Sequence, residues 1–315
     1  MLSMATPVVL AAEPEPESSS PVTVDEAAAG DEDMLDTSRA SVRAATEWLA
    51  SGINSWFGDR PFEDGGKVTQ GRFAVRTLWR QDDGWDFNVR LRAKVELPNL
   101  RDNAYFFFGQ ENEEELVSDR PDAFTREQQL LKTDRSDDQT AFAGLGVLLR
   151  ENLDFRVGVR SAYKVYAQAR YLHDWSLSER NHLQFRETVF WRVHDGFGST
   201  TSLDYEHLRT PTLAFRWQNA VTITEETNDF AWGSSLGAFK SYGDDRLLST
   251  ELVITGETGS RHDVGEYGVR LKWQQPVLRR WLIGELIVGH YWPQDEENEE
   301  RDRSWALGAG VEMRF

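Results

Sequence analysis

From Gly71 to its last residue, the chain repeatedly alternates apolar and polar side chains over runs of about ten residues, the length with which a tilted strand crosses a bilayer. The clearest run covers residues 85–97. Its apolar and polar members have opposite parity: Trp85, Phe87, Val89, Leu91, Ala93, Val95 and Leu97 against Asp86, Asn88, Arg90, Arg92, Lys94 and Glu96. A helix would scatter both sets around its circumference, so the pattern predicts a strand whose two faces meet different surroundings.

Similar runs recur along the chain and predict fourteen strands. They lie near residues 71–81, 85–97, 103–110, 139–150, 153–161, 164–174, 181–193, 198–207, 212–223, 229–240, 246–257, 264–274, 280–292 and 303–315. The fold class expected is all-β, a transmembrane antiparallel up-and-down β-barrel at 71–315. The predicted count of fourteen fits this class, because bacterial barrels have an even number of strands. Twelve or sixteen strands stay open as alternatives, since Phe106–Phe108 and the Gly144/Gly146 pair blur the alternation in two runs.

Average composition hides this pattern. The mean hydropathy of -0.57 argues against membrane-spanning helices, but a barrel needs only every second strand residue to be apolar. The chain has no cysteine, which excludes a disulfide scaffold and a zinc–thiolate site. A soluble all-β protein is the competing interpretation, and it would have to cover many long apolar faces.

The formal net charge of -18 is concentrated in residues 13–36, 111–138 and 293–303, and the rest of the chain is nearly balanced. Acidic runs of this kind are typical of solvated linkers and loops. A second interpretation is that the two acidic loops bind divalent cations or cationic partners.

Tryptophans gather at the ends of the predicted strands, where strands meet the two membrane interfaces. With the first strand running outward, the outer group is Trp79, Trp85, Trp191, Trp232, Trp292 and Trp305, and the inner group is Trp175, Trp273 and Trp281. Among the strand tryptophans, Trp217 alone lies mid-strand. The same orientation places the long connections 111–138 and 293–302 outside and short turns inside, as is usual for such barrels.

The last predicted strand ends the chain on Phe315, with Met313 and Val311 on the same face. This resembles the C-terminal signal of Gram-negative outer-membrane β-barrel proteins, which the barrel assembly machinery reads. The Trp-Phe-Gly-Asp stretch at 56–59 also resembles a segment before the first strand of uncharacterised, porin-like proteobacterial barrels. The resemblance implies the bacterial outer membrane, contact with its lipid and lipopolysaccharide, and insertion by the assembly machinery.

The segment before the barrel divides into three parts. Residues 1–12 have a short apolar run without a basic segment and are interpreted as a signal-peptide remnant. Residues 13–36 predict a disordered acidic linker, and residues 37–66 a periplasmic amphipathic helix and linker. The helix, near 38–56, has one apolar stripe: Val42, Ala45, Trp48, Leu49, Ile53 and Trp56. The stripe would dock under the barrel, enter its lumen, lie on the inner leaflet or bind a periplasmic partner.

The polar strand faces predict a densely charged lumen in which bases outnumber acids. The candidate lumen-lining residues are Arg72, Arg76, Arg90, Arg92, Lys94, Arg156, Arg160, Arg170, Arg186, Arg216, Arg270, Lys272, Glu96, Glu266 and Glu285. In one interpretation, Arg and carboxylates cross-link a narrow interior and leave little passage. In the other, they line a pore that attracts anions or acidic oligosaccharides. Glu187 falls on the predicted lipid face, and the alternation does not explain it.

Catalytic motifs are weak in this sequence. His194-Asp195 and His262-Asp263 fall in predicted outer turns, where omptin-like proteases keep His and Asp, but surface turns favour both residue types. Ser199 near His194 suggests an acyl hydrolase, without the His-x-Ser triplet of known membrane deacylases. The sequence shows no metal-spaced cluster, phosphate loop or nucleic-acid patch. We therefore expect no catalytic residue, metal or cofactor.

The function expected is that of a monomeric passive channel for small polar or anionic solutes through an Arg-rich lumen. The alternative is a structural or interaction barrel with a plugged lumen, which binds lipopolysaccharide through cations or a periplasmic partner through the helix. An outer-membrane hydrolase is a remote alternative.

Overall fold

The structure is a computed structural model that describes residues 24–55, 57–100, 103–112, 139–160, 164–193, 196–243, 245–294 and 300–315. The chain divides into two compact units, residues 1–38 and 39–315. Within the described ranges, no helix is both long and apolar enough to cross a membrane.

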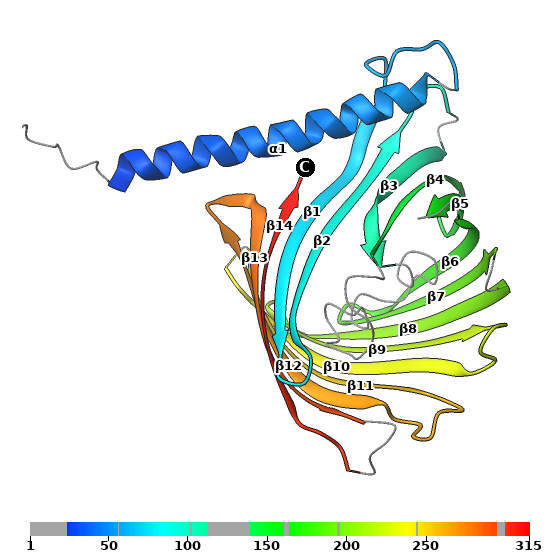
Figure 1. The fold of residues 1–315 in the computed structure, drawn as a ribbon, viewed down its shortest axis with the longest axis vertical. Coiled ribbons are helices and arrows are strands. Elements are labelled where there is room, and N and C mark those ends of the chain that lie inside the picture. Colours follow the sequence, from blue (N-terminus) through cyan, green and yellow to red (C-terminus); the bar gives the residue numbers. More distant parts are fainter. Residues whose placement is uncertain are drawn as a thin grey trace, which may run out of the picture. The chain divides into compact units, whose positions relative to one another are not determined.

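Fourteen antiparallel strands form one closed barrel, which confirms the predicted fold class and strand number. Each strand pairs with its neighbours in sequence, and β1 pairs with β14 to close the ring, with Val75 opposite Val311 (Figure 1). The strands are β1 Lys67–Arg80, β2 Gly84–Glu96, β3 Ala104–Asn112, β4 Gln139–Arg150, β5 Leu153–Arg160, β6 Lys164–Ser178, β7 Asn181–Arg192, β8 Gly196–Thr210, β9 Leu213–Thr224, β10 Phe230–Tyr242, β11 Arg246–Glu257, β12 Glu266–Val277, β13 Arg279–Pro293 and β14 Ser304–Arg314. Boundaries differ from the predicted ones by a few residues.

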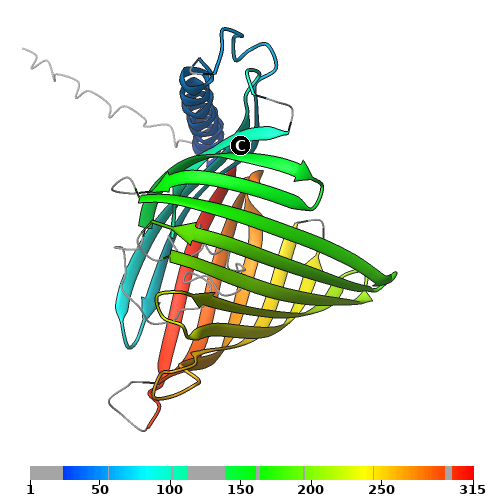
Figure 2. The same ribbon diagram turned by 90° about the vertical axis from the view of Figure 1, so that its right-hand side faces the viewer.

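The alternation in the sequence becomes two surfaces with opposite chemistry. On β12, Tyr267 and Leu271 are exposed while Arg270 between them is buried. Phe87 and Val157 are exposed in the same way. A soluble fold would bury the apolar set, whereas a barrel in lipid turns it outward and keeps the charged set inside. The strands run side by side and inclined around the ring (Figure 2), as closure of a sheet into a barrel requires.

The blurred alternation of β3 and β4 has a steric cause. Tyr105 and Phe107 on β3 point inward and lie over glycines of β4. A Cβ at Gly146 would lie 2.2 Å from Cζ of Tyr105, and one at Gly144 would lie 2.6 Å from Cζ of Phe107. Glycine is therefore required where an inward ring crosses the neighbouring strand.

The helix is longer than the sequence predicted. Helix α1 spans Val24–Asn54, so the disordered linker expected at 13–36 is wrong for its described part, residues 24–36. Alanine is the strongest helix former, and residues 24–36 are rich in it, which the low hydrophobicity of the segment concealed. Residues 1–23 and Trp56 lie outside the described residues, as does the signal remnant at 1–12.

The part of α1 that belongs to the barrel unit contacts the barrel through only part of the predicted stripe and through residues beside it. Ala50, with Ile53 beside it, packs against Val95, Leu97 and Phe106, which belong to the outward faces of β2 and β3. This contact places the end of the helix on the outer wall and not in the lumen.

Ala45, Trp48 and Leu49 of the predicted stripe do not dock against the barrel, because they are exposed, Trp48 to 74%. Contact of these residues with the inner leaflet or with a partner stays a prediction. Thr46 and Ala50 are buried instead. Their small side chains let the helix approach the strands closely, and the carbonyl oxygen of Asn54 accepts a hydrogen bond from Nδ2 of Asn99 at 3.1 Å.

Candidate functional site

The inner face of the barrel is identified by ion pairs that cross several strands. Nη2 of Arg80 on β1 lies 3.4 Å from Oε2 of Glu266 on β12, although β14 and β13 separate the two strands. Neighbouring strands are about 4.8 Å apart, so the two side chains can meet only on the concave side of the wall, where they converge. The charged faces of the strands therefore point into the barrel.

One sector of this inner face carries closely paired charges. We call it the paired wall and define it by Arg76, Arg80, Glu251, Glu266, Arg270, Lys272 and Glu285 on β1 and β11–β13. Arg270 and Glu251 stand directly opposite each other, are 1% and 4% exposed, and form an ion pair through Nη2 and Oε2. The second oxygen of Glu251 accepts a hydrogen bond from Ser249 at 3.0 Å.

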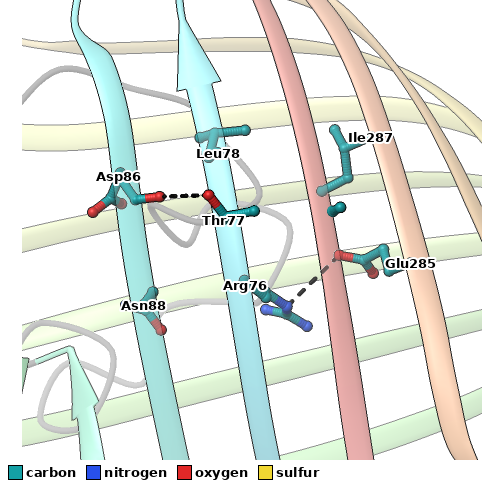
Figure 3. A pocket seen from close by; sticks show the side chains of 8 residues that line it. Arg76, Thr77, Leu78, Asp86, Asn88, Glu285 and Ile287 are labelled. Atoms are coloured by element: carbon teal, nitrogen blue, oxygen red, sulfur yellow. Dashed lines mark hydrogen bonds and ion pairs between the residues drawn. The ribbon is translucent and has the colours of Figure 1, made fainter.

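Glu285 joins three strands within the paired wall. Its Oε1 lies 3.7 Å from Nε of Arg76 across β14, and its Oε2 lies 3.6 Å from Nζ of Lys272. Gln274 donates a hydrogen bond to the same Oε2 at 2.6 Å. Figure 3 shows Arg76 and Glu285 pointing toward each other beside a small pocket whose lining includes Asn88 and Ile287. Gly310 lies between them on β14, where any side chain would press on Arg76.

The paired wall ends in a charged cluster at the turn between β1 and β2. Asp82 accepts hydrogen bonds from Nη2 of Arg80 at 2.6 Å and from Oγ of Ser304 at 2.5 Å. Burial disfavours the ionised carboxyl, but the hydrogen bonds of Ser304 and Arg80 and the charge of Arg80 outweigh it. The pKa of Asp82 therefore lies below its usual value.

A second sector, which we call the basic wall, places bases beside bases. It comprises Arg72, Arg90, Arg92, Lys94, Arg160, Lys164, Arg170, Arg186 and Arg192 on β1, β2 and β5–β7. Arg72 stands directly opposite Arg92, and Arg160 directly opposite Lys164. Like charges directly opposite each other are unfavourable in a sheet unless other groups compensate them. Arg170 stands directly opposite Asp154.

Aromatic side chains share the basic wall, and the sequence analysis missed them. Tyr105, Phe107, Phe142, Tyr166 and Phe190 form a buried inner cluster. Lys94 lies 3.7 Å above the Tyr105 ring, and Arg192 lies 5.4 Å from the centre of the Phe190 ring. These aromatics have the parity of the charged residues and not that of the lipid-facing ones, and this parity is the sequence signal that could have identified them.

The predicted lumen-lining residues differ in exposure. Arg160, Arg270, Lys272, Glu266 and Glu285 are buried; Arg76, Arg90, Lys94, Arg156, Arg170, Arg186 and Arg216 are half-buried; Arg72, Arg92 and Glu96 are exposed. Two further local pairs occur. Arg156 lies 2.9 Å from Asp154, whose other oxygen accepts from the Tyr105 hydroxyl, and Arg216 lies 2.6 Å from Glu206. The structure thus separates the candidate residues into the two walls and these local pairs.

The tryptophans of both predicted groups lie in the terminal parts of their strands. Trp79 stands opposite Trp85 beside the first turn. Trp292 stacks on Tyr267, and His290 contacts both Trp292 and Trp305. At the other ends, Trp175 contacts His173, Trp273 contacts Tyr242, and Trp281 lies under Arg39. Trp191 and Trp232 are half-buried near the starts or ends of β7 and β10.

The C-terminal residues close the ring. The backbone N–H of Phe315 donates to the carbonyl of Gly71 at 3.0 Å, and its ring lies beside that glycine. Val311 is 44% exposed on the outer wall, but Met313, expected to face lipid with it, is only 8% exposed. Met313 stands opposite Leu282, which is also 8% exposed. The next residue, Arg314, accepts a hydrogen bond at its carbonyl oxygen from Arg39 of the helix.

The weak catalytic candidates do not form a site in the part of the chain that is described. His194 and Asp195 lie outside it. No hydrogen bond joins the described side chains of His262 and Asp263, and Ser199 donates to Glu187 on the outer wall. No described group of three or more His, Cys, Asp or Glu residues is arranged to hold a metal ion. The acidic loops are described only at their edges, so their cation binding stays a prediction.

Comparison with known proteins supports the fold and nothing finer. No protein-family model and no curated protein matches the sequence. OprB of Pseudomonas putida matches with a TM-score of 0.50 at 9% identity, over 81% of this chain and 95% of its own. A loop-deletion mutant of OmpT, an outer membrane protein of Vibrio cholerae, matches with a TM-score of 0.46 at 11% identity, over 79% and 99%. The KdgM porin matches with a TM-score of 0.40 at 8% identity, over 78% and 99%.

The closed ring of fourteen strands, the apolar exposed outer wall and the charged inner wall together define the class of protein. Only a lipid environment suits such an outer wall, and bacterial outer membranes are where closed barrels of this kind reside. The chain is a closed fourteen-strand β-barrel of the bacterial outer membrane.

Proposed function

We propose that the barrel is a passive channel for small polar and anionic solutes, with the basic wall as its selective surface. The observation that carries this proposal is the direct opposition of Arg72 to Arg92 and of Arg160 to Lys164 on the inner face. Opposed bases cost stability in a sheet, and they attract anions to the surface that they share.

Barrel size supports a passage. Eight strands are enough for side chains to fill the interior, and fourteen enclose more room. The described charges of the paired wall form ion pairs with one another, whereas the register of the basic wall sets bases opposite bases, an arrangement that favours an anion between them. Arg72 and Arg92 are exposed, which leaves them accessible to a solute.

Planar-bilayer recording of the full chain tests this function. We expect discrete conductance steps and, in a potassium chloride gradient, a reversal potential that indicates preference for chloride. Steps with cation preference would contradict the role of the basic wall, and no conductance from a folded, membrane-inserted barrel would contradict the channel itself.

A structural barrel is the second candidate, and the inner aromatic cluster favours it. Tyr105, Tyr166 and Phe190 are at most 2% exposed, so part of the interior is filled. A barrel of this kind would act through lipopolysaccharide, through cations at its acidic loops or through a partner bound by the N-terminal helix. Absence of conductance together with chelator-sensitive lipopolysaccharide binding would favour this candidate.

A further inference from the structure

The outer wall carries a group of polar side chains where hydrocarbon is expected. We call it the outer polar patch and define it by Glu187 on β7, Ser199 and Thr201 on β8, Asn219 on β9 and Ser234 on β10. These strands are consecutive neighbours in the ring, and they run side by side in Figure 2. The patch is independent of the lumen, so an inference from it does not rest on the proposed channel function.

The parity of β7 shows that Glu187 faces outward. Val189 has the same parity and is 46% exposed, whereas Thr188 and Phe190 are buried on the inner face. Glu187 lies near the middle of β7, between Phe185 and Val189 on the outward face. The sequence analysis had placed it on the lipid face without explanation, and the strand register confirms that position.

Hydrogen bonds link the patch without neutralising its charge. Glu187 accepts from the hydroxyl of Ser199 and, at 2.6 Å, from that of Thr201. Ser234 donates to Oδ1 of Asn219 at 2.9 Å and accepts from Nε1 of Trp217 at 3.0 Å. No described cation forms an ion pair with Glu187. The carboxyl group is therefore oriented by hydroxyls of its own chain, and the described residues place no ion-pair partner beside it.

Such a group is costly against lipid. Charged side chains at the bilayer midplane of a barrel wall cost about 2–4 kcal/mol for bases and less for acids, and ionisable groups in membranes usually meet a partner. The outer wall of β11–β14 shows the contrast, since Leu252, Leu271, Val288 and Leu307 make it apolar at comparable positions. The outer polar patch is thus a local feature of one side of the barrel.

The surroundings of Glu187 offer both halves of a self-complementary contact. His173 on β6 has outward parity and stands diagonal to Glu187, because Tyr171 is opposite Glu187 and His173 is opposite Phe185. Its ring contacts Tyr171 and Trp175, and its nitrogens form no hydrogen bond with another described residue. An imidazole donor and a carboxylate acceptor lie side by side on one surface, so a second copy of the same surface can pair with both.

The neighbouring outward positions on β6 are small. Ala167 and Ala169 share the parity of Tyr171, with Ala169 opposite Val189 of β7. Small residues let two membrane walls approach closely enough for polar side chains to bond across the interface.

We propose that a second copy of this chain covers the outer polar patch, so that the protein forms a two-fold dimer through the outer faces of β6–β9. Glu187 of each copy accepts a hydrogen bond from a donor of the other, with the His173 imidazole as the main donor. This replaces the monomer expected from the sequence.

Cysteine cross-linking in native outer membranes tests the dimer, because the chain has no cysteine of its own. Ala169→Cys places one thiol beside the patch, and Leu252→Cys places a matched control on the apolar wall of β11. With a short bifunctional thiol reagent, we expect a covalent dimer from Ala169→Cys and only background from Leu252→Cys. Equal yields from both variants, no dimer from either, or coupling of Ala169→Cys to a different protein would overturn the second copy as occupant.

Glu187→Gln tests the chemistry of the contact. It should lower the dimer association constant measured by native mass spectrometry by about tenfold, the combined effect of weakening the two symmetry-related charge-assisted hydrogen bonds. Thr250→Val, an exposed polar change on the outward face of β11, should leave the dimer unchanged. Heat-dependent gel mobility confirms that each barrel is folded. If Glu187→Gln misfolds, His173→Phe provides the same test, and a folded variant of either kind with an unchanged dimer would refute the proposed pairing.

Discussion

The paired wall and the basic wall are built from the same residue types on the same kind of strand, yet they behave as opposites. On β11 and β12, Glu251 stands opposite Arg270, so the register joins unlike charges. On β1 and β2, the register joins Arg72 to Arg92. A shift of two residues would still set Arg72 opposite Arg90 or Lys94, because every inward position near Arg92 on β2 carries a base. The distribution of acids among the strands, together with the register, therefore determines whether unlike or like charges meet on an inner wall.

The difference also appears in burial. Arg270 and Glu251 are almost fully covered, whereas Arg72 and Arg92 are exposed. Covered charges need each other, because a single uncompensated charge in a low-dielectric site is costly. Exposed charges are solvated, so they tolerate like neighbours and remain available to a solute.

Removal of one partner from the paired wall should give the largest effect. Glu251→Ala leaves Arg270 buried without its carboxylate, and we expect a loss of about 3–5 kcal/mol in the free energy of unfolding. Urea-induced unfolding of the barrel in lipid bilayers measures this loss.

Two variants sharpen this first test. Glu206→Ala breaks the Arg216 pair, whose side chains are 41% and 29% exposed, and should cost about 1 kcal/mol or less. The double change Glu251→Leu with Arg270→Met should recover most of the stability. An equal loss for Glu251→Ala and Glu206→Ala would remove the energetic distinction that defines the paired wall.

The basic wall should be sensitive to sterics where its rings cross glycines. In Gly146→Ala the new Cβ would lie 2.2 Å from the Tyr105 ring, and that ring is held by hydrogen bonds of its hydroxyl to Asp154 and from Arg156. We expect a destabilisation of about 1–3 kcal/mol, the usual cost of overpacking. Gly265→Ala is the matched control, because the nearest atom to its Cβ position, the carbonyl oxygen of Thr255, lies 3.9 Å away, an ordinary van der Waals distance. Comparable unfolding curves for the two variants would contradict the steric account.

Charge reversal on the basic wall should change selectivity rather than stability. The double change Arg72→Glu and Arg92→Glu should lower the chloride-to-potassium permeability ratio about fivefold, which corresponds to about 1 kcal/mol of solvated charge interaction at close range. The reversal potential in a potassium chloride gradient measures it. Arg280→Glu changes a base that is 86% exposed and paired with Asp245 outside the inner wall, and it should leave the ratio unchanged.

The sequence was sufficient to predict the barrel because a period of two is a direct property of the strand backbone. Thirteen-residue stretches such as 85–97 predicted both the strand and the face of each side chain. Pairing in the walls was not predictable, since Arg80 meets Glu266 only after the ring has closed between β1 and β14. The alternation within one strand does not predict the curvature of the barrel wall, and this curvature brings the side chains of β1 and β12 within reach of each other.

The helix shows where the same reasoning fails. Its apolar residues suggested a stripe through Trp48, but Thr46 and Ala50 face the barrel. Close approach to a wall of large side chains such as Phe106 favours small residues on the helix, so hydrophobicity alone did not identify Ala50 as a residue that contacts the barrel. Glu187 is the converse case, in which an exception to the alternation pointed to the outer polar patch.

The smallest effect expected concerns the turn that ends the paired wall. The pKa of Asp82 is lower in the folded protein than in the unfolded chain, because Ser304 and Arg80 outweigh the opposing effect of burial. The ionised carboxyl therefore adds stability that is fully present above the unfolded pKa, about 3.9 for an aspartate, and is lost as pH falls through the folded value. Asp82→Asn should remove this contribution, with a change below about 1 kcal/mol because the turn is exposed to solvent.

Unfolding free energies of the native chain, Asp82→Asn and Ser304→Ala, measured from about pH 6 to about pH 3, separate this effect from general acid sensitivity. The difference between the native chain and Asp82→Asn should shrink as pH falls. Ser304→Ala removes the hydroxyl that lies 2.5 Å from Oδ1 of Asp82, which raises the folded pKa and moves the loss to higher pH. A difference that is constant over this range would mean that Asp82 acts through shape alone, and the paired wall would then end at Arg80 and Glu266.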